Sequence, residues 1–144
     1  MSKSLKILFI FLISLIMFAS TADISSAKKS KGMTDAQITE LTTTINDLTQ
    51  KVYSASLFSP QENNKLVDIK MKLDAAIAID SSNPAYPMLY YKTGILYKAR
   101  EYKDDAADCF QTIIDLFGDT PYAAKAMTEL KKMGVKVVAP APAQ

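Results

Sequence analysis

Few residues in this sequence have side chains suited to catalysis or metal binding. The 144-residue chain contains no histidine and no tryptophan, and its one thiol belongs to Cys109. Without histidine, the sequence excludes imidazole bases, histidine metal ligands and Ser-His-Asp triads. Cys109 also shares an apolar helical stripe with Ile113 and Leu116. We therefore expect the thiol to pack in a core rather than to act as a nucleophile.

The densest acidic cluster is formed by Asp104, Asp105 and Asp108. These residues lack the loop spacing and the number of ligands that a calcium site needs. They suit the first turn of a helix, where negative charge is stabilised by the helix dipole. The chain also has no glycine-rich phosphate-binding loop. The sequence thus predicts a protein that is not an enzyme and that has no catalytic residues, no metal and no cofactor.

The N-terminus has the order of features that is typical of a secretory signal peptide. Lys3 and Lys6 precede an apolar run over residues 7–18, and small residues follow. We predict a signal peptide over 1–27, cleaved after Ala22 or Ala27, and export to the periplasm or cell envelope. The alternative is an uncleaved helix that anchors the protein to the inner membrane, although the uncharged stretch is shorter than the roughly 20 residues of a usual span.

Charge gives little indication of a partner. The chain has 17 Lys and Arg against 15 Asp and Glu, which is a net charge of +2. So small a charge predicts no nucleic-acid partner, and membrane contact only through the N-terminal segment. A single cysteine cannot form an intramolecular disulfide, so the exported domain must rely on its hydrophobic core.

Apolar residues at spacings of three and four predict an all-α domain over 34–133. The five expected helices cover about 34–56, 60–80, 84–100, 103–117 and 121–133. Thr34 and Ser59 are the expected N-caps of the first two, each with a Gln or Glu three residues later. Asn83 is the expected cap of the third, with Pro84 as its first residue. Gly118 and Gly134 are the expected stops of the last two.

The segments outside these helices are polar or rich in Pro and Ala. Residues 28–33 are expected to form a linker, and residues 134–144 a flexible tail. We find no alternating segment long enough for a sheet, and the one candidate for a short strand is 135–138.

The sequence contains an internal repeat. Aligning Pro84 with Pro121 also aligns Asp68 with Asp105 and Leu73 with Phe110. The helix at 60–80 and the start of the next helix thus recur as the helix at 103–117 and the start of its successor. Repeated helical pairs stack because neither pair can bury its apolar face alone.

One part of the repeat resembles a known family. The residues that carry the resemblance are Tyr90, Gly94, Tyr97, Ala106, Phe110 and Pro121. Their types and order are similar to the tetratricopeptide repeat signature, which implies antiparallel helical hairpins stacked into a short solenoid. Tyr90 stands where that family usually has Trp, Thr93 replaces the usual Leu, and the loop before Pro121 is longer than the standard one.

The longer loop and the stretch GDTPYAAKAM resemble repeats of exported bacterial envelope proteins, of the Tol-Pal coordinator and outer-membrane assembly lipoprotein type. The resemblance covers about 66–133, with a good match only over 87–121, and it leaves the helix at 34–56 outside.

Gly94 has a physical explanation that does not depend on the family. A glycine inside a helix costs about 1 kcal/mol relative to alanine. Such a residue is expected where another chain segment comes close. We expect Gly94 and Ala106 to let two antiparallel helices approach, with Tyr97 and Phe110 filling the remaining space.

The resemblance also implies a concave groove for a peptide or a partner helix, lined here by Met88, Tyr91, Ile95 and Lys98. Tyrosine and methionine are common on binding surfaces. The alternative is that the helix at 34–56 simply covers this face.

These observations predict a non-catalytic adaptor or scaffold of the bacterial cell envelope that binds another protein or peptide. The second interpretation is a structural homo-oligomer that assembles through the helix at 34–56, whose apolar spacing resembles a coiled-coil seam. The third, an enzyme or metal carrier, is disfavoured by the missing histidines.

Overall fold

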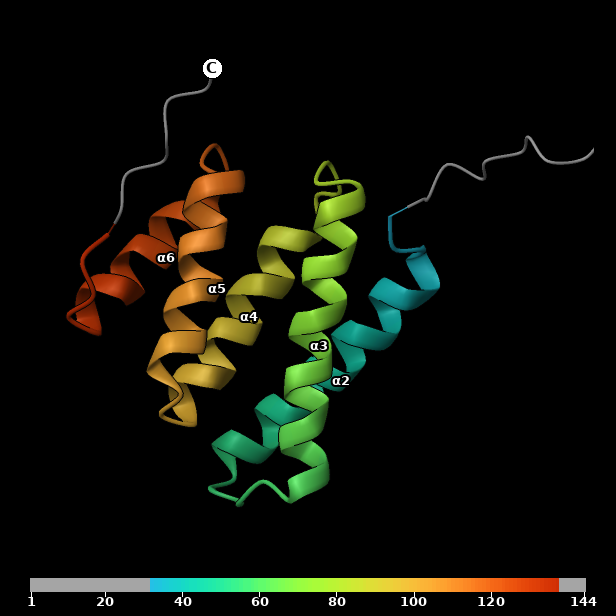
Figure 1. Ribbon diagram of the computed structural model, residues 1–144. Coiled ribbons are helices and arrows are strands. Elements are labelled where there is room, and N and C mark those ends of the chain that lie inside the picture. The colour runs from blue at the N-terminus through green and yellow to red at the C-terminus, as the bar shows by residue number, and fades with distance from the viewer. Residues whose placement is uncertain (1–31, 138–144) are drawn as a thin grey trace, which may run out of the picture. The chain divides into compact units, whose positions relative to one another are not determined.

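The computed structural model describes residues 32–137, and within them it shows five helices and no strand (Figure 1). The helices are α2 (Asp35–Tyr53), α3 (Pro60–Ile79), α4 (Tyr86–Ala99), α5 (Lys103–Leu116) and α6 (Pro121–Lys132). The all-α prediction is confirmed. Residues 135–137 form no strand, so that prediction is wrong for the described part of 135–138. The predicted signal peptide over 1–27, most of the linker and the tail from 138 onward lie outside the described residues.

The first two helices begin as their sequences predict, with capping boxes. The Thr34 hydroxyl accepts a hydrogen bond from the Gln37 backbone N–H, and the Gln37 side chain accepts one from the Thr34 N–H at 2.9 Å. Ser59 and Glu62 form the same reciprocal pair, and Pro60 is the first residue of α3. Each N-cap satisfies backbone donors that a helix start leaves free, which is worth about 1 kcal/mol.

The predicted start of α4 is wrong by two residues. Asn83 does not cap a helix that opens at Pro84: its side chain accepts from the Ala85 N–H at 2.9 Å, and its carbonyl accepts from the Tyr86 N–H at 3.2 Å. These bonds make a separate turn, because an asparagine side chain readily bonds the backbone two residues on. The helix therefore begins at Tyr86, and Pro87 takes the first-turn position.

The helices α2, α4 and α6 end in the same way. The residue after each cap is left-handed: Ala55 (φ 54°), Glu101 (φ 64°) and Gly134 (φ 70°). The next backbone N–H then reaches back to a carbonyl in the last turn, from Ser56 to Lys51, Tyr102 to Tyr97 and Val135 to Leu130. This pattern is a Schellman motif. The sequence predicts this motif only at the end of α6, because the motifs that end α2 and α4 have no glycine at the left-handed position.

The helices form two layers within the described domain. The front layer in Figure 1 contains α3 and α5, and α2, α4 and α6 lie behind it. Each helix packs on the next one along the chain, and α4 also packs on both α2 and α6. In consequence α4 is the central helix, and eight of its residues are buried.

The residues that carry the family resemblance lie on three consecutive helices. Tyr90, Gly94, Tyr97, Ala106 and Phe110 are buried between α4 and α5, whereas Pro121 is the exposed first residue of α6. The Tyr90 hydroxyl donates to Asp74 on α3 at 2.6 Å, and the Tyr97 hydroxyl donates to the Leu66 carbonyl at 3.4 Å. Both tyrosines thus connect the α4–α5 hairpin to α3.

The apolar stripe of α2 lies inside the domain. Leu41, Ile45 and Leu48 are buried, and Ile38 and Val52 pack against the core. The stripe on which the second interpretation placed a self-association seam is therefore used by the fold itself.

Candidate partner-binding face

The four predicted groove residues all lie on α4, and each is partly buried. Met88, Tyr91 and Ile95 pack against the core. The ring of Tyr91 lies 5.8 Å from that of Phe110 on α5 and 5.8 Å from that of Tyr122 on α6. Tyr91 therefore has its aromatic neighbours on α5 and α6, while α2 packs elsewhere along α4 through contacts such as that of Lys92 with Asn46.

Lys98 has a structural partner. The ammonium groups of Lys98 and Lys132 both form ion pairs with the carboxylate of Glu129. Glu129 is only 7 % exposed. The hydrogen bonds from Lys132 and Lys98 lower the pKa of the Glu129 carboxyl. A nearly buried carboxylate needs such partners. Lys98 therefore joins α4 to α6.

Lys125 takes the exposed place beside the aromatic pair. Its ammonium nitrogen is 5.1 Å from the Tyr122 ring centroid and 6.0 Å from that of Tyr91. Cations in this position are attracted by the electron-rich faces of aromatic rings. Burial raises the pKa of the Tyr91 hydroxyl, so the ring remains neutral beside the lysine. The three side chains present one aromatic and cationic surface that spans α4 and α6.

Positive charge is concentrated on these two helices. Together α4 and α6 carry five lysines and one acidic residue, whereas α5 carries four aspartates and one lysine. Lys92 extends the positive surface toward α2, where it donates to the side-chain carbonyl of Asn46 at 3.0 Å. We call this surface the basic face and define it by Tyr91, Lys92, Lys98, Tyr122, Lys125 and Lys132.

Sequence reasoning missed the part of the basic face that α6 contributes. The internal repeat contains a signal for it: when Pro84 is aligned with Pro121, Lys125 falls on Met88 and Lys132 falls on Ile95. Both Met88 and Ile95 were expected to line the groove. Applying the groove positions to the second copy of the repeat would therefore have identified both lysines.

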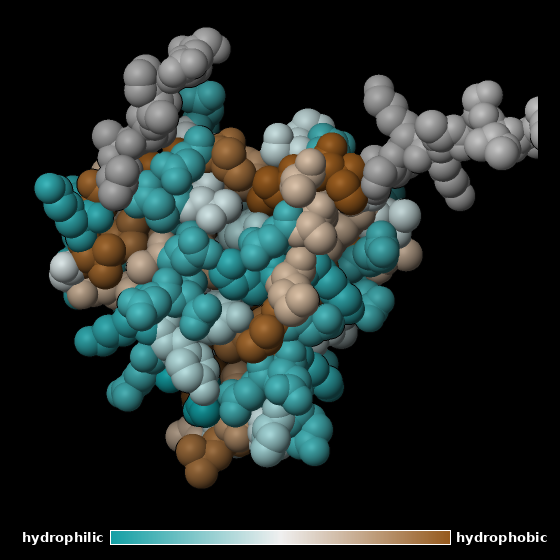
Figure 2. Space-filling model, in the orientation of Figure 1, coloured by the Kyte–Doolittle hydropathy of each residue, from teal (hydrophilic) through white to brown (hydrophobic). Residues whose placement is uncertain are grey.

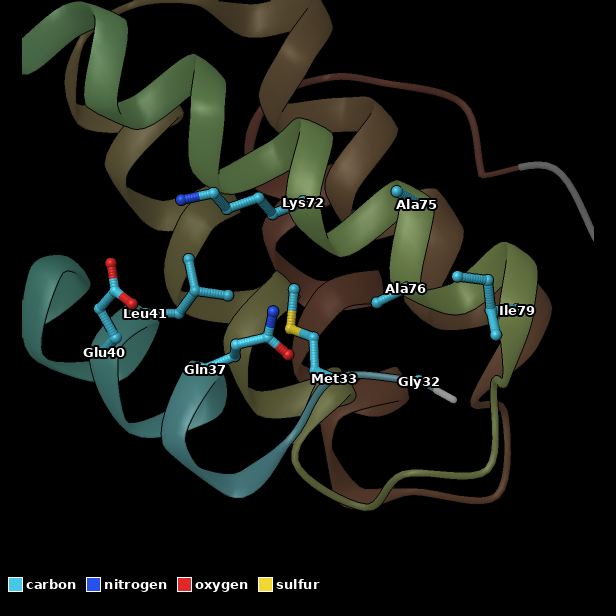
Figure 3. A pocket seen from close by; sticks show the side chains of 9 residues that line it. All are labelled: Gly32, Met33, Gln37, Glu40, Leu41, Lys72, Ala75, Ala76 and Ile79. Carbon is cyan, nitrogen blue, oxygen red and sulfur yellow. The ribbon is translucent and has the colours of Figure 1, made fainter. Parts of the chain in front are cut away.

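A separate cavity of about 280 Å³ lies between α2 and α3 (Figure 3). Met33, Leu41, Ala76 and Ile79 give it an apolar lining, while Gln37, Glu40 and Lys72 supply polar groups. The backbone N–H of Met33 donates to the Tyr86 hydroxyl at 3.0 Å, which fixes the chain where it enters the cavity wall. The cavity has room for an apolar side chain, but it brings together no nucleophile with a base.

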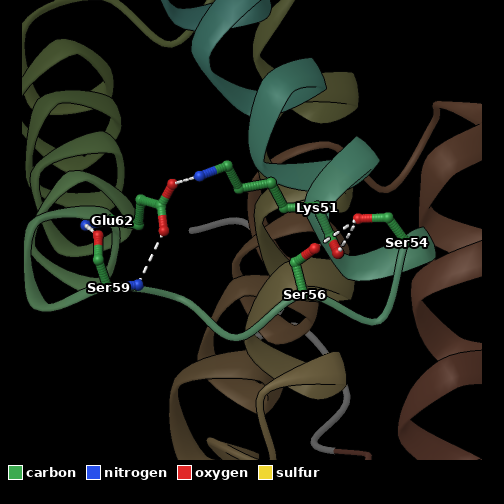
Figure 4. Close-up of polar contacts among 5 residues, drawn as sticks. All are labelled: Lys51, Ser54, Ser56, Ser59 and Glu62. Carbon is green, nitrogen blue, oxygen red and sulfur yellow. Dashed lines mark hydrogen bonds and ion pairs between the residues drawn. The ribbon is translucent and has the colours of Figure 1, made fainter.

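The connection between α2 and α3 holds a cluster of serines with charged neighbours (Figure 4). Lys51 forms an ion pair with Glu62, and the other Glu62 oxygen accepts from the Ser59 N–H at 2.8 Å. The Ser54 hydroxyl donates to the Lys51 carbonyl at 3.0 Å and lies 2.9 Å from that of Ser56. These contacts stabilise the connection, and the Glu62 carboxylate in it is bound to Lys51 and to a backbone N–H rather than to a serine hydroxyl that it could activate.

Packing and an ion pair account for Cys109 and Asp108, two residues that the sequence offered as candidates for chemistry. Cys109 is buried, and burial raises the pKa of its thiol to about 12. The thiol is thus protonated at neutral pH and is a poor nucleophile. Asp108 forms an ion pair with Lys70 of α3 at 2.7 Å. Within residues 32–137, no group of three or more His, Cys, Asp or Glu side chains is placed to hold a metal ion.

Of the helices in the described part of the chain, none combines the length and the apolar character that crossing a bilayer requires. No family model matches this sequence, and neither a curated protein nor a solved structure matches it.

Proposed function

We propose that this chain is a non-catalytic adaptor of the bacterial cell envelope that binds a segment of a partner protein on the basic face. The observation that carries the proposal is the contact of Lys125 with the rings of Tyr91 and Tyr122. Exposed lysines next to partly buried tyrosines provide charge and apolar area in one place, as protein-binding surfaces commonly do. The export signal that we infer from residues 1–27 supports the location.

The packing of the helices supports a tetratricopeptide-like architecture. The hairpin of α2 and α3 precedes that of α4 and α5, and α6 follows as a single helix, while α2, α4 and α6 form one layer. A solenoid of helical hairpins has this alternation, in which the first helix of every pair lines one surface. On this interpretation α2, which the sequence resemblance leaves outside, is the first helix of an additional repeat.

The charges of the basic face favour an acidic partner segment. Glu129 is the only acidic residue of α4 and α6, and its two ion pairs leave Lys125 and Lys92 without a carboxylate partner on these helices. An acidic peptide or helix with an apolar side chain would pair with these lysines and cover the rings of Tyr91 and Tyr122. Such complementarity raises the association rate and excludes basic competitors.

Site-specific photocrosslinking tests this proposal in the cells that make the protein. A photoreactive amino acid at position 125 should give a discrete crosslinked product, because that side chain is exposed at the centre of the basic face. The same amino acid at Asp115, which is exposed on α5, is the matched control. Equal products at both positions, or a product at Asp115 alone, would place the binding surface elsewhere.

A substitution complements the crosslinking. Lys125→Glu reverses the charge at an exposed site and should reduce capture of the crosslinked partner by at least about tenfold, with unchanged helicity. Lys98→Glu is unsuitable, because it would place a second carboxylate against the nearly buried Glu129 and would unfold the α4–α6 contact. Unchanged capture by the Lys125→Glu variant would contradict the proposal.

A further inference from the structure

The helix α3 has a second apolar stripe, and this one faces solvent. Val67, Met71 and Ile79 are 50 %, 65 % and 47 % exposed, and the small side chains of Ala75 and Ala78 are exposed beside them. Ala75 and Ile79 also line the cavity between α2 and α3. Successive members at positions 67, 71, 75 and 79 are four residues apart, so they follow one side of the helix. Figure 2 shows hydrophobic side chains along the front of the molecule, where Figure 1 places α3.

This stripe is not needed for the core of the domain. The opposite side of α3 supplies the buried residues Leu66, Ile69, Leu73 and Ala76. A helix at the surface of a domain normally has polar residues on its outer side. Single exposed apolar residues are common, but a row of them on one helix usually marks an interaction surface.

The charges next to the stripe are self-complementary. Asp68 and Lys72 lie one turn apart at its edge and form an ion pair at 2.9 Å, with both side chains about half exposed. If a second α3 runs antiparallel along this edge, its base lies near the acid of the first helix, and its acid lies near the base of the first. The charges of Asp68 and Lys72 cancel, so this edge has no net charge that would attract the headgroups of a lipid surface.

We propose that α3 is the contact surface for a second copy of this chain, with the two α3 helices packed antiparallel about a two-fold axis at Met71. In this register Met71 lies opposite Met71 of the second copy, and Val67 lies opposite Ala75, so large side chains meet small ones. Asp68 lies near Lys72 of the second copy, and Lys72 lies near its Asp68. The same patch is used twice, which is the property of an isologous dimer interface.

This dimer is compatible with the adaptor function but does not depend on it. The stripe belongs to the layer of α3 and α5, whereas the basic face is formed by the other layer. A dimer through α3 therefore leaves both basic faces free, and it presents two binding sites on one particle. The contact covers about three helical turns, so it is small, and we expect reversible association.

The primary test is the mass of the purified exported chain in sedimentation equilibrium, up to a concentration of about 100 µM, where a small interface should associate. We expect a monomer–dimer equilibrium. Met71→Lys should raise the dimer dissociation constant by at least about tenfold, because the lysine would be buried at the axis. Met127→Lys, at an exposed methionine on α6, is the matched control and should leave the constant unchanged.

Two further variants test the register. Asp68→Lys should weaken the dimer, and adding Lys72→Asp should restore it, because the two edges again carry opposite charges. Met71→Cys should give a disulfide-linked dimer under mild oxidation, whereas Met127→Cys should not. Cys109 is buried and does not interfere. A chain that is monomeric at all concentrations, or a dimer that Met71→Lys does not weaken, overturns the proposal, and a Met71→Cys dimer that does not crosslink overturns the register.

Discussion

The aromatic ring of Phe110 occupies the space that a side chain at Gly94 would need. A β-carbon added at Gly94 would lie 2.7 Å from Cε1 of Phe110 and 3.0 Å from its Cζ. Phe110 is fully buried, and Tyr91 contacts its ring from α4, so the ring has little freedom to move away. The close approach that the sequence predicts at Gly94 is thus an approach to Phe110, and it fixes how α4 and α5 pack.

Gly94→Ala should lower the free energy of unfolding by about 1–3 kcal/mol, because overpacking a buried site outweighs the advantage of about 1 kcal/mol that alanine has in a helix. Urea unfolding followed by circular dichroism measures the change. Phe110→Leu is the companion variant: its cost should be smaller in the Gly94→Ala background than in the natural chain, since the shorter side chain makes room. A stabilising Gly94→Ala substitution would show that the helices can separate without cost.

Glu129 should make the domain more stable at a pH above the usual carboxyl pKa than at a lower pH. Its pKa is lowered by the bonds from Lys132 and Lys98, so the folded state holds the ionised form more strongly than the unfolded chain does. This contribution is present above pH 4.5, the ordinary pKa of the group, and is lost as the pH falls through the lower folded-state pKa. Glu129→Gln should flatten that part of the pH dependence in urea unfolding. A curve with the slope of the natural protein would contradict the assignment.

Ala55→Gly and Glu101→Gly should each stabilise the domain by about 1 kcal/mol, because both positions are left-handed and only glycine adopts this conformation without strain. Thermal unfolding measures the gain. Ala124→Gly, in the exposed middle of α6, is the control and should destabilise by about 1 kcal/mol. Equal losses at all three positions would mean that Ala55 and Glu101 are not left-handed in solution.

The thiol of Cys109 should react with a thiol reagent only when the domain opens. Its pKa of about 12 and its burial leave neither thiolate nor access in the folded state. The rate of reaction with Ellman's reagent should therefore rise with urea in parallel with unfolding. Met127→Cys, which places an exposed thiol on α6 outside the proposed dimer contact, is the internal control. Rapid modification of Cys109 in the absence of urea would place it at the surface.

The helices were predictable because their signals are local. Thr34, Ser59 and the apolar spacing of each segment are read within a few residues, and the structure confirms the first two helix starts. The start of α4 was not predictable in the same way, because Asn83 can cap a helix or close a turn, and two prolines offered two starting points. The left-handed residues Ala55 and Glu101 were missed since neither type favours that conformation.

The candidate site was predictable only on the helix that carries the family signature. Tyr91 and Lys98 were identified on α4, but their partners Tyr122, Lys125 and Glu129 depend on which helix lies beside it. For the same reason, the apolar side of α2 resembled an oligomer seam until its burial against the rest of the domain was seen. The exposed stripe of α3 was missed because it lies on a second apolar side of the helix, opposite the side that packs in the core.

The lysines on α4 and α6 and the aspartates on α5 give these neighbouring helices opposite charges, although the net charge of the chain is small. A polyanion at a distance comparable to the Debye length would rotate the molecule before attracting it. Encounters would then begin with the basic face already turned toward the partner. Added salt would slow binding by randomising this orientation, even if the bound complex were equally stable.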